Sequence, residues 1–235
     1  MSNLIIIDLD GTLIPITGYA EANGHCIDIL KRVFGRACPR SRELIRCNQV
    51  IDIPRMEQHE FSLERFPQSW GFVYLNLCDQ LRVEFDQNIH QELMVAAGHF
   101  QDGPFIAYPG VIETLVELES RRYEFHLVTS GRRGEELQHH KVDEAGLRPF
   151  FPRSCMTITG IDKSADFRAL ISANGIGAWV IGDSPKHDIA PGKAAGARTV
   201  LVEGNTWFYT EAEVEPDYRI KTFDRVVDLL PYSKP

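Results

Sequence analysis

Four short apolar runs stand out along the chain, and small or polar residues follow each of them. They cover residues 4–7, 124–128, 178–181 and 198–202. Their length and their content of β-branched residues predict strands. A parallel strand that is covered on both faces is apolar at nearly every position, and the letters "LIII", "WVI" and "TVLV" have this character.

Segments with helical periodicity lie between these runs. They cover residues 111–119, about 133–145 and about 165–173. In the first of them, Val111, Leu115 and Leu118 recur on one helical face. Strands that alternate with helices predict an α/β fold, in which helices cover both faces of a Rossmann-like parallel sheet.

The segment from about residue 15 to residue 105 has no convincing strand pattern and several amphipathic helix patterns. Its apolar residues recur at helical spacing in two clear stripes, which are Ile27, Leu30 and Phe34, and Trp70, Val73, Tyr74, Leu77, Cys78 and Leu81. We therefore predict an α-helical cap domain at 15–104, inserted into a core made of 1–14 and 105–235. Pro104 and the Pro109–Gly110 pair mark the return to the core. Residues 231–235 are expected to form a frayed end.

The composition narrows the class of partner. The net charge of -8 argues against a nucleic acid polymer or an anionic membrane surface as the main partner. No apolar run approaches the roughly 18 residues that are needed to span a bilayer. The five cysteines are odd in number and form no CxxC pair, which argues against a disulfide framework or a zinc site. Reduced thiols in a cytoplasmic protein are the expectation.

Polar residues follow three of the predicted strands. Asp8 ends the first, Thr129 and Ser130 end the second, and Asp183 comes just after the third. Because ligands bind outside the carboxyl ends of the strands of an open α/β sheet, these residues are expected on one rim. The sequence therefore predicts a site at this edge of the sheet.

Four carboxylates would meet there, from Asp8, Asp10, Asp183 and Asp188. Like charges in a partly desolvated site repel strongly, and a divalent cation relieves the repulsion. Oxygen ligands with room for a phosphate oxygen suit Mg²⁺, and Lys163 supplies a further positive charge. Since a Gly-Thr turn breaks the strand after Asp10, the first two carboxylates can take two roles, one as nucleophile and one as proton donor.

The order of these motifs resembles the haloacid dehalogenase-like superfamily of hydrolases. The matching elements are "DLDGTL", "LVTSG", Lys163 and "GDSPKHD". The resemblance covers residues 1–14 and about 105–225. Over the helical insertion it is only positional, and it matches members that have a helical cap after the first strand.

The resemblance implies a role for each catalytic residue. Asp8 attacks phosphorus and becomes an aspartyl-phosphate. Asp10 protonates the leaving oxygen and then activates water, and its backbone carbonyl helps to hold the metal. Thr129 binds the transferring phosphoryl group, and Lys163 offsets the negative charge. Dehalogenases of the family have no acid at the position of Asp10, so phosphoryl chemistry is favoured here.

The remaining assignments concern metal and substrate. Asp183 is expected to ligate magnesium, and Asp188 to support the metal or the lysine. The substrate is expected to meet backbone and side chains next to these motifs, which are Gly11, Thr12, Ser130, Gly131 and Arg132. Six basic residues between Lys31 and Arg46 form either a solvated helix face or a lid over an anionic substrate. His139 and His140 fall in a helical pattern and are expected to be solvated.

The sequence thus predicts a magnesium-dependent phosphatase that acts on a small phosphorylated metabolite in the cytoplasm. Two alternatives stay open. One is a phosphotransferase or phosphomutase that uses the same aspartyl-phosphate, and the other is a non-catalytic protein that binds partners. The oligomeric state, monomer or homodimer, is not readable from the sequence.

Overall fold

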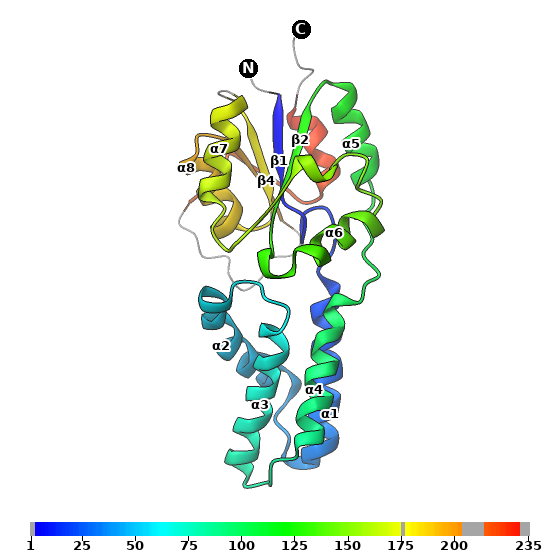
Figure 1. Cartoon of the computed structure of the whole chain (residues 1–235), viewed down its shortest axis with the longest axis vertical. Coiled ribbons are helices and arrows are strands. Elements are labelled where there is room, and N and C mark those ends of the chain that lie inside the picture. The colour runs from blue at the N-terminus through cyan, green and yellow to red at the C-terminus, as the bar shows by residue number, and fades with distance from the viewer. Residues whose placement is uncertain (1–2, 175–176, 204–213, 231–235) are drawn as a thin grey trace. The chain divides into compact units, whose positions relative to one another are not determined.

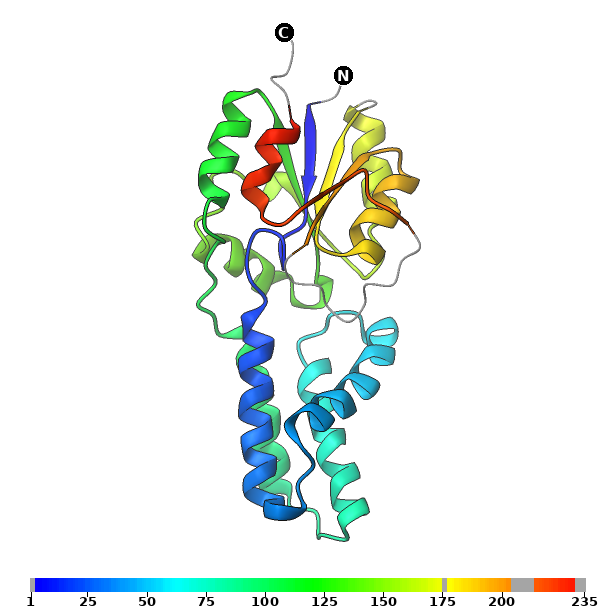
Figure 2. The same ribbon diagram turned by 180° about the vertical axis from the view of Figure 1, so that it is seen from behind.

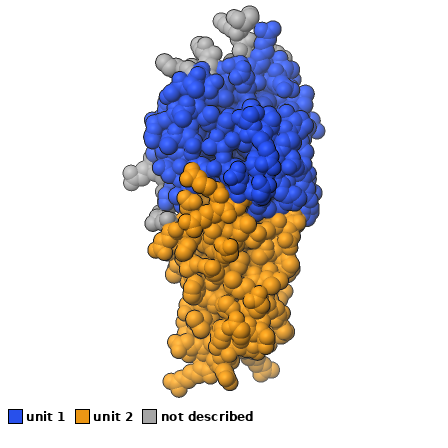
Figure 3. Space-filling view, in the orientation of Figure 1, with its two compact units in different colours: residues 1–16, 104–131, 135–235 blue, residues 17–103, 132–134 orange. Residues whose placement is uncertain are grey.

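The computed structural model describes residues 3–174, 177–203 and 214–230 (Figure 1), and the predicted frayed end at 231–235 lies outside them. The chain divides into two compact units, which Figure 3 colours separately. Unit 1 contains residues 1–16, 104–131 and 135–235, and unit 2 contains residues 17–103 and 132–134.

Unit 1 is built on a six-stranded sheet in the order β3-β2-β1-β4-β5-β6, in which all strand pairs are parallel. The strands are β1 (Leu4–Ile7), β2 (Glu124–Ser130), β3 (Met156–Thr159), β4 (Trp179–Gly182), β5 (Arg198–Val202) and β6 (Tyr218–Ile220). The predicted parallel sheet is confirmed. β1 pairs with β2 on one side and with β4 on the other. The sheet therefore extends in opposite directions from β1, and ligands of such sheets bind at the carboxyl end of the strands at this switch point.

The sequence did not predict β3 and β6, the two edge strands. β3 has the sequence "MTIT" and is only partly buried at three of its four positions. β6 is three residues long, and two of its residues are exposed. Edge strands are less covered than central ones, so they lack the continuous apolar run that revealed the others.

Helices cover both faces of the sheet, as predicted (Figures 1 and 2). Ile5 and Ile7 of β1 belong to a core cluster that includes residues of α5, α6 and α9, whereas Leu4 and Ile6 belong to a cluster on the other face that includes residues of α7. Alternate residues of one strand thus fill two cores. The helices of unit 1 are α5 (Val111–Ser120), α6 (Glu135–Glu144), η4 (Arg153–Cys155), α7 (Ser164–Asn174), η5 (Pro185–Ile189), α8 (Ala190–Ala194), η6 (Phe223–Arg225) and α9 (Val226–Leu229).

Unit 2 is a helical insertion that follows β1. Helix α1 packs against α4, α4 against α3, and α3 against α2. Trp70 and Tyr74 from the predicted stripe of α3 are almost fully buried, and the indole N–H of Trp70 donates to Asn23 of α1. The helices of unit 2 are α1 (Thr17–Phe34), η1 (Gly35–Ala37), α2 (Ser41–His59), α3 (Arg65–Leu81), α4 (Gln87–Gly98), η2 (His99–Gln101) and η3 (Arg132–Gly134).

Candidate active site

Asp8 is held at the carboxyl end of β1 by strand pairing that continues beyond the strand. Its backbone N–H donates to the carbonyl of Ile181 in β4 at 3.0 Å. Leu9 then accepts the N–H groups of Leu13 and Ile14 at 2.9 and 3.1 Å, which closes a tight turn. The turn takes the chain out of the sheet directly after Asp8. Asp8 is therefore buried on a rigid strand end, and Asp10 begins a different path.

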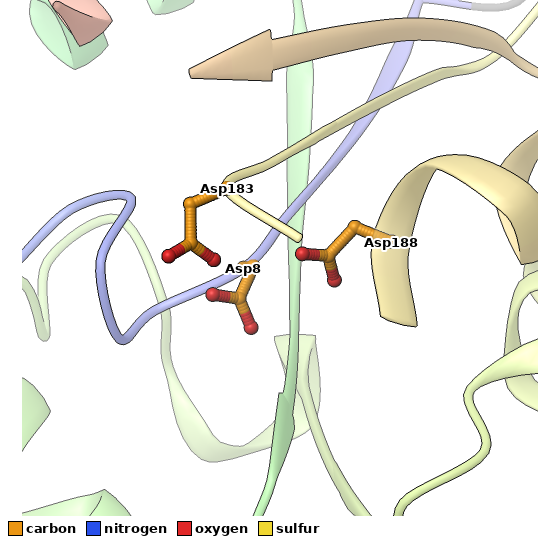
Figure 4. A group of neighbouring side chains, drawn as sticks. All are labelled: Asp8, Asp183 and Asp188. Atoms are coloured by element: carbon orange, nitrogen blue, oxygen red, sulfur yellow. The ribbon is translucent and has the colours of Figure 1, made fainter. Parts of the chain in front are cut away.

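Two further carboxylates lie beside Asp8. Asp183 follows β4 directly, and Asp188 lies in the short helix η5. One oxygen from each of the three carboxylates lies within 4.8 Å of the others, and all three residues are buried. Figure 4 shows the three carboxylates gathered where β1 and β4 end. The structure thus brings together three of the four predicted acidic residues in a group that could hold a metal ion.

Two glycines make room for these carboxylates. Gly11 has a φ of +83°, and a Cβ there would collide with the carboxylate of Asp183. A Cβ on Gly182 would collide with the carboxylate of Asp188. At both positions the absence of a Cβ lets the backbone approach a carboxylate that is not its sequence neighbour.

Lys163 joins two of the acids. It comes just before α7, its side chain is buried, and its Nζ lies 2.5 Å from Asp8 Oδ1 and 2.7 Å from Asp188 Oδ1. The other oxygen of Asp188 accepts the backbone N–H of Ser184 at 3.0 Å. Both oxygens of Asp188 are therefore engaged, and this residue positions the lysine.

The electrostatics of the group favour a cation. Burial, together with the charges of Asp188 and Asp10, outweighs the attraction of Lys163 and raises the pKa of Asp8 from 3.8 to about 7. Burial and the neighbouring Asp8 and Asp188 raise the pKa of Asp183 well above its ordinary value. Burial opposes the charge of Lys163, but Asp188 and Asp8 raise its pKa above the usual range. One lysine does not neutralise three buried acids, and hard carboxylate oxygens fit a divalent cation.

The carboxylate of Asp10 has a partner that the sequence did not reveal. Nζ of Lys141, in α6, lies 2.8 Å from both oxygens of Asp10. Gln138, Lys141 and Val142 are all buried on one face of this helix. The only signal in the sequence was the spacing of three positions between Gln138 and Lys141, which places both on one helical face beside Val142. The expectation that His139 is solvated is wrong, because it lies buried on the same helix.

Thr129 is the penultimate residue of β2 and is buried. Its hydroxyl donates to Oε1 of Gln138 at 3.4 Å. Gly131 follows with a φ of +134°, and its backbone N–H donates to the carbonyl of Thr159 at 3.0 Å. The hydroxyl of Thr12 donates to Oδ2 of Asp8 at 3.4 Å.

That Ser130 and Arg132 bind the substrate stays a prediction. Ser130 ends β2 and is partly exposed. Arg132 falls in unit 2, so its place at the site stays a prediction.

Comparison with known proteins identifies the family. The family model of haloacid dehalogenase-like hydrolases matches residues 3–196. The chain belongs to this family of hydrolases. No curated protein has significant sequence similarity to the chain.

Several solved structures resemble that of this hydrolase. A haloacid dehalogenase-like family hydrolase from Xanthomonas campestris has 15% identity and a TM-score of 0.72, over 96% of this chain and 90% of that one. A predicted phosphoglycolate phosphatase from Haemophilus somnus 129PT has 19% identity and a TM-score of 0.62, over 97% of each chain. A protein proposed to be a β-phosphoglucomutase from Thermotoga maritima has 16% identity and a TM-score of 0.61, over 97% of this chain and 98% of that one. Dehalogenases are also among these structures. At such identities the likeness shows the fold of the hydrolase.

Two further expectations concern the surface of the hydrolase. All six basic residues between Lys31 and Arg46 are exposed, and Arg32 forms an ion pair with Glu92 at 2.5 Å. That they contact a substrate stays a prediction. Among the described residues, no helix is both long and apolar enough to cross a membrane.

Proposed function

We propose that this hydrolase is a magnesium-dependent phosphatase that acts on a small phosphate monoester through an aspartyl-phosphate on Asp8. The main support is the position of Asp10. Its carboxylate lies two residues beyond Asp8, at the start of the turn that leaves the sheet, and is 28% exposed where that of Asp8 is 9% exposed. One carboxylate is therefore held still in a desolvated place, and the other is within reach of water and a leaving group.

Asp8 is suited to be the nucleophile. A carboxylate that attacks phosphorus must be placed in line with the leaving oxygen, and its charge must be offset as it approaches a phosphate. Lys163 holds Oδ1 of Asp8 at 2.5 Å and carries one of the offsetting charges. Attack by Asp8 forms a bond from its oxygen to phosphorus, and the ester bond from phosphorus to the leaving oxygen breaks.

Asp10 is suited to move the proton. It gives a proton to the leaving oxygen as the ester bond breaks, and it then takes one from the water that hydrolyses the aspartyl-phosphate. The hydroxyl of Thr129 is proposed to bind an oxygen of the transferring phosphoryl group. Gly11, Thr12, Ser130, Gly131 and Arg132 are proposed to complete the substrate site.

Magnesium would be held by Asp8, Asp183 and the backbone carbonyl of Asp10, with Asp188 as a further ligand or as the partner of Lys163. When bound, it supplies positive charge to the phosphoryl oxygens and to the nucleophile. The donor set supports this proposal because its acidic groups outnumber its lysines and all three carboxylates of the cluster are buried. A cytoplasmic location is also proposed, and none of the five cysteines forms a disulfide.

The stability of the metal-free protein is expected to fall as the pH rises. Between its unfolded pKa of 3.8 and its folded pKa of about 7, Asp8 keeps a proton in the native state that the unfolded chain has released. The native state therefore binds more protons, and the free energy of unfolding decreases with pH over this range. Magnesium competes with these protons, so it should raise the melting temperature more at about pH 8 than at about pH 5. Calorimetry in magnesium and in chelator tests this, and an equal gain at both pH values would contradict it.

A panel of phosphate monoesters tests the proposed function. The panel contains sugar phosphates, nucleotides, short phosphorylated acids and 4-nitrophenyl phosphate, each with magnesium or with chelator. Magnesium-dependent release of inorganic phosphate is expected from at least one member. Transfer of the phosphoryl group to an added alcohol or sugar phosphate, in preference to water, would instead indicate a phosphotransferase or mutase. A folded protein that binds magnesium but neither releases phosphate from any member nor transfers it to an acceptor would contradict both.

A further inference from the structure

Lys141 is a buried cation directed at a single functional carboxylate. Its side chain is 8% exposed, and its Nζ lies 2.8 Å from each oxygen of Asp10. The two residues are 131 positions apart in the sequence. Burying a lysine is costly unless its charge is paired, so the burial of Lys141 depends on the carboxylate of Asp10.

We propose that Lys141 is a positioning residue for Asp10, and that it fixes the carboxylate in the place from which it moves the proton. The proposal rests on the proposed phosphatase function. It adds helix α6, which lies outside the four motifs recognised in the sequence, to the parts of the chain on which the reaction depends.

Packing around Lys141 holds its helix and the ring beside its ammonium in place. The ammonium lies 5.6 Å from the centre of the ring of Phe105, in a cation–π contact. One turn further along α6, the carboxylate of Glu144 accepts the backbone N–H of Phe105 at 3.2 Å. Val142, the next residue, is fully buried in the core that also contains Ile5 and Ile7. These contacts therefore help to fix the lysine in addition to its ion pair with Asp10.

The same face of α6 also supports the end of β2. Gln138 lies one turn before Lys141, and its Oε1 accepts a hydrogen bond from the hydroxyl of Thr129 at 3.4 Å. A Cβ on Gly131 would come 2.8 Å from Nε2 of Gln138, so the backbone approaches this side chain closely. One helix thus contacts both Asp10, which follows β1, and Thr129, which lies near the end of β2. This sets the distance between the residue that moves the proton and the hydroxyl proposed to bind the phosphoryl group.

The chemistry allows the contact to persist during the reaction. An ammonium has three donors, so one can stay on one oxygen of Asp10 while the other oxygen holds the proton. The electron pair of the breaking ester bond goes to the leaving oxygen, which takes that proton. A poor leaving group, such as an alkoxide, needs this proton, whereas 4-nitrophenolate leaves without it. If the carboxylate of Asp10 is no longer held in position, the resulting loss of rate is therefore expected to depend on the leaving group.

Lys141→Met tests the proposal, with Lys141→Arg as the variant that keeps a charge and donors. Lys193→Met is the matched control. It removes a lysine of α8 whose Nζ lies 3.2 Å from a carboxylate oxygen of Asp217, away from the candidate site. At saturating magnesium, we expect Lys141→Met to lower kcat/KM for an alkyl phosphate roughly 10- to 100-fold, below the full value of an acid–base residue. For 4-nitrophenyl phosphate, kcat/KM should stay nearly unchanged.

The second step gives an independent signature. Because Asp10 also activates the water, kcat for 4-nitrophenyl phosphate should fall in Lys141→Met, and a burst of 4-nitrophenolate should precede the steady state. Lys141→Arg should recover part of both losses, and Lys193→Met should match the wild type. An equal loss of kcat/KM for both substrates, or no loss, would overturn the proposal. If Lys141→Met does not fold, Lys141→Gln and Lys141→Arg decide by the same comparison.

A double-mutant cycle separates this proposal from the proposed function. If the wild type releases phosphate from no ester, the function fails, and urea unfolding of Lys141→Met, Asp10→Asn and the double variant still tests the pair. A double variant no less stable than Asp10→Asn alone would support the contact, because the unpaired buried lysine is then gone. Strictly additive losses would overturn it.

Discussion

Replacement of Asp8 by asparagine is expected to abolish phosphate release while leaving the protein at least as stable at about pH 8. Asparagine has nearly the same shape, but its amide is not a nucleophile, so the rate should fall by at least about 10³-fold. The charge of Asp8 is costly in the native state, since burial, helped by Asp188 and Asp10, raises its pKa to about 7. Removal of that charge relieves the repulsion, and Lys163 keeps Asp188 as its partner at 2.7 Å.

Asp217→Asn is the matched control for this prediction. Partial burial opposes the charge of Asp217, but hydrogen bonds from Thr199 and the charge of Lys193 outweigh it and lower the pKa of the carboxyl. Neutralising Asp217 should therefore reduce the free energy of unfolding at about pH 8 and leave phosphate release unchanged. Steady-state release and urea unfolding of both variants measure the contrast. An Asp8→Asn protein that still turns over, or one that unfolds more easily than Asp217→Asn, would contradict the prediction.

Replacement of Lys163 by methionine is expected to have the largest effect on stability. The variant leaves Asp8 and Asp188 buried without the cation that lies 2.5 and 2.7 Å from them. Removal of one partner from a buried ion pair costs about 3–5 kcal/mol, because the remaining charge is uncompensated. In chelator at about pH 8, urea unfolding should show a loss of this order. Phosphate release should also fall steeply, since Asp8, the proposed nucleophile, loses its orienting contact with Lys163.

The double variant Asp8→Asn with Lys163→Met identifies the cause of that loss. With one carboxylate neutralised, the repulsion is smaller, so the double variant should be more stable than Lys163→Met alone. Added magnesium should also recover more stability in Lys163→Met than in the wild type, because the cation replaces the missing charge. A double variant that is less stable than Lys163→Met would mean that lost packing, and not unpaired charge, dominates.

Local pattern was sufficient for the central part of the fold. The four predicted runs are β1, β2, β4 and β5, and three of them are almost continuously apolar because strands in the middle of a parallel sheet are buried on both faces. In β2, Glu124 and His126 interrupt the apolar run. The stripe in 70–81 became α3 for the same kind of reason, since one face of a helix fills a core. The sequence also predicted that polar residues at the ends of these strands form one site. Asp8 and Asp183 converge because the carboxyl ends of parallel strands share one rim, and Asp188 joins them from η5, which follows β4.

Other features depend on contacts between distant segments. The edge strands β3 and β6 are partly exposed, so their sequences resemble those of loops, and only pairing with β2 and β5 makes them strands. Nothing near Asp10 in the sequence indicates Lys141, which is brought to it by the packing of α6 against the sheet. A lysine in a polar helix is usually solvated, and only the tertiary structure shows which lysine is buried. By itself, the sequence determined the motifs of the candidate site and the central strands that hold them, whereas the supports of those motifs were decided by packing between segments far apart in the chain.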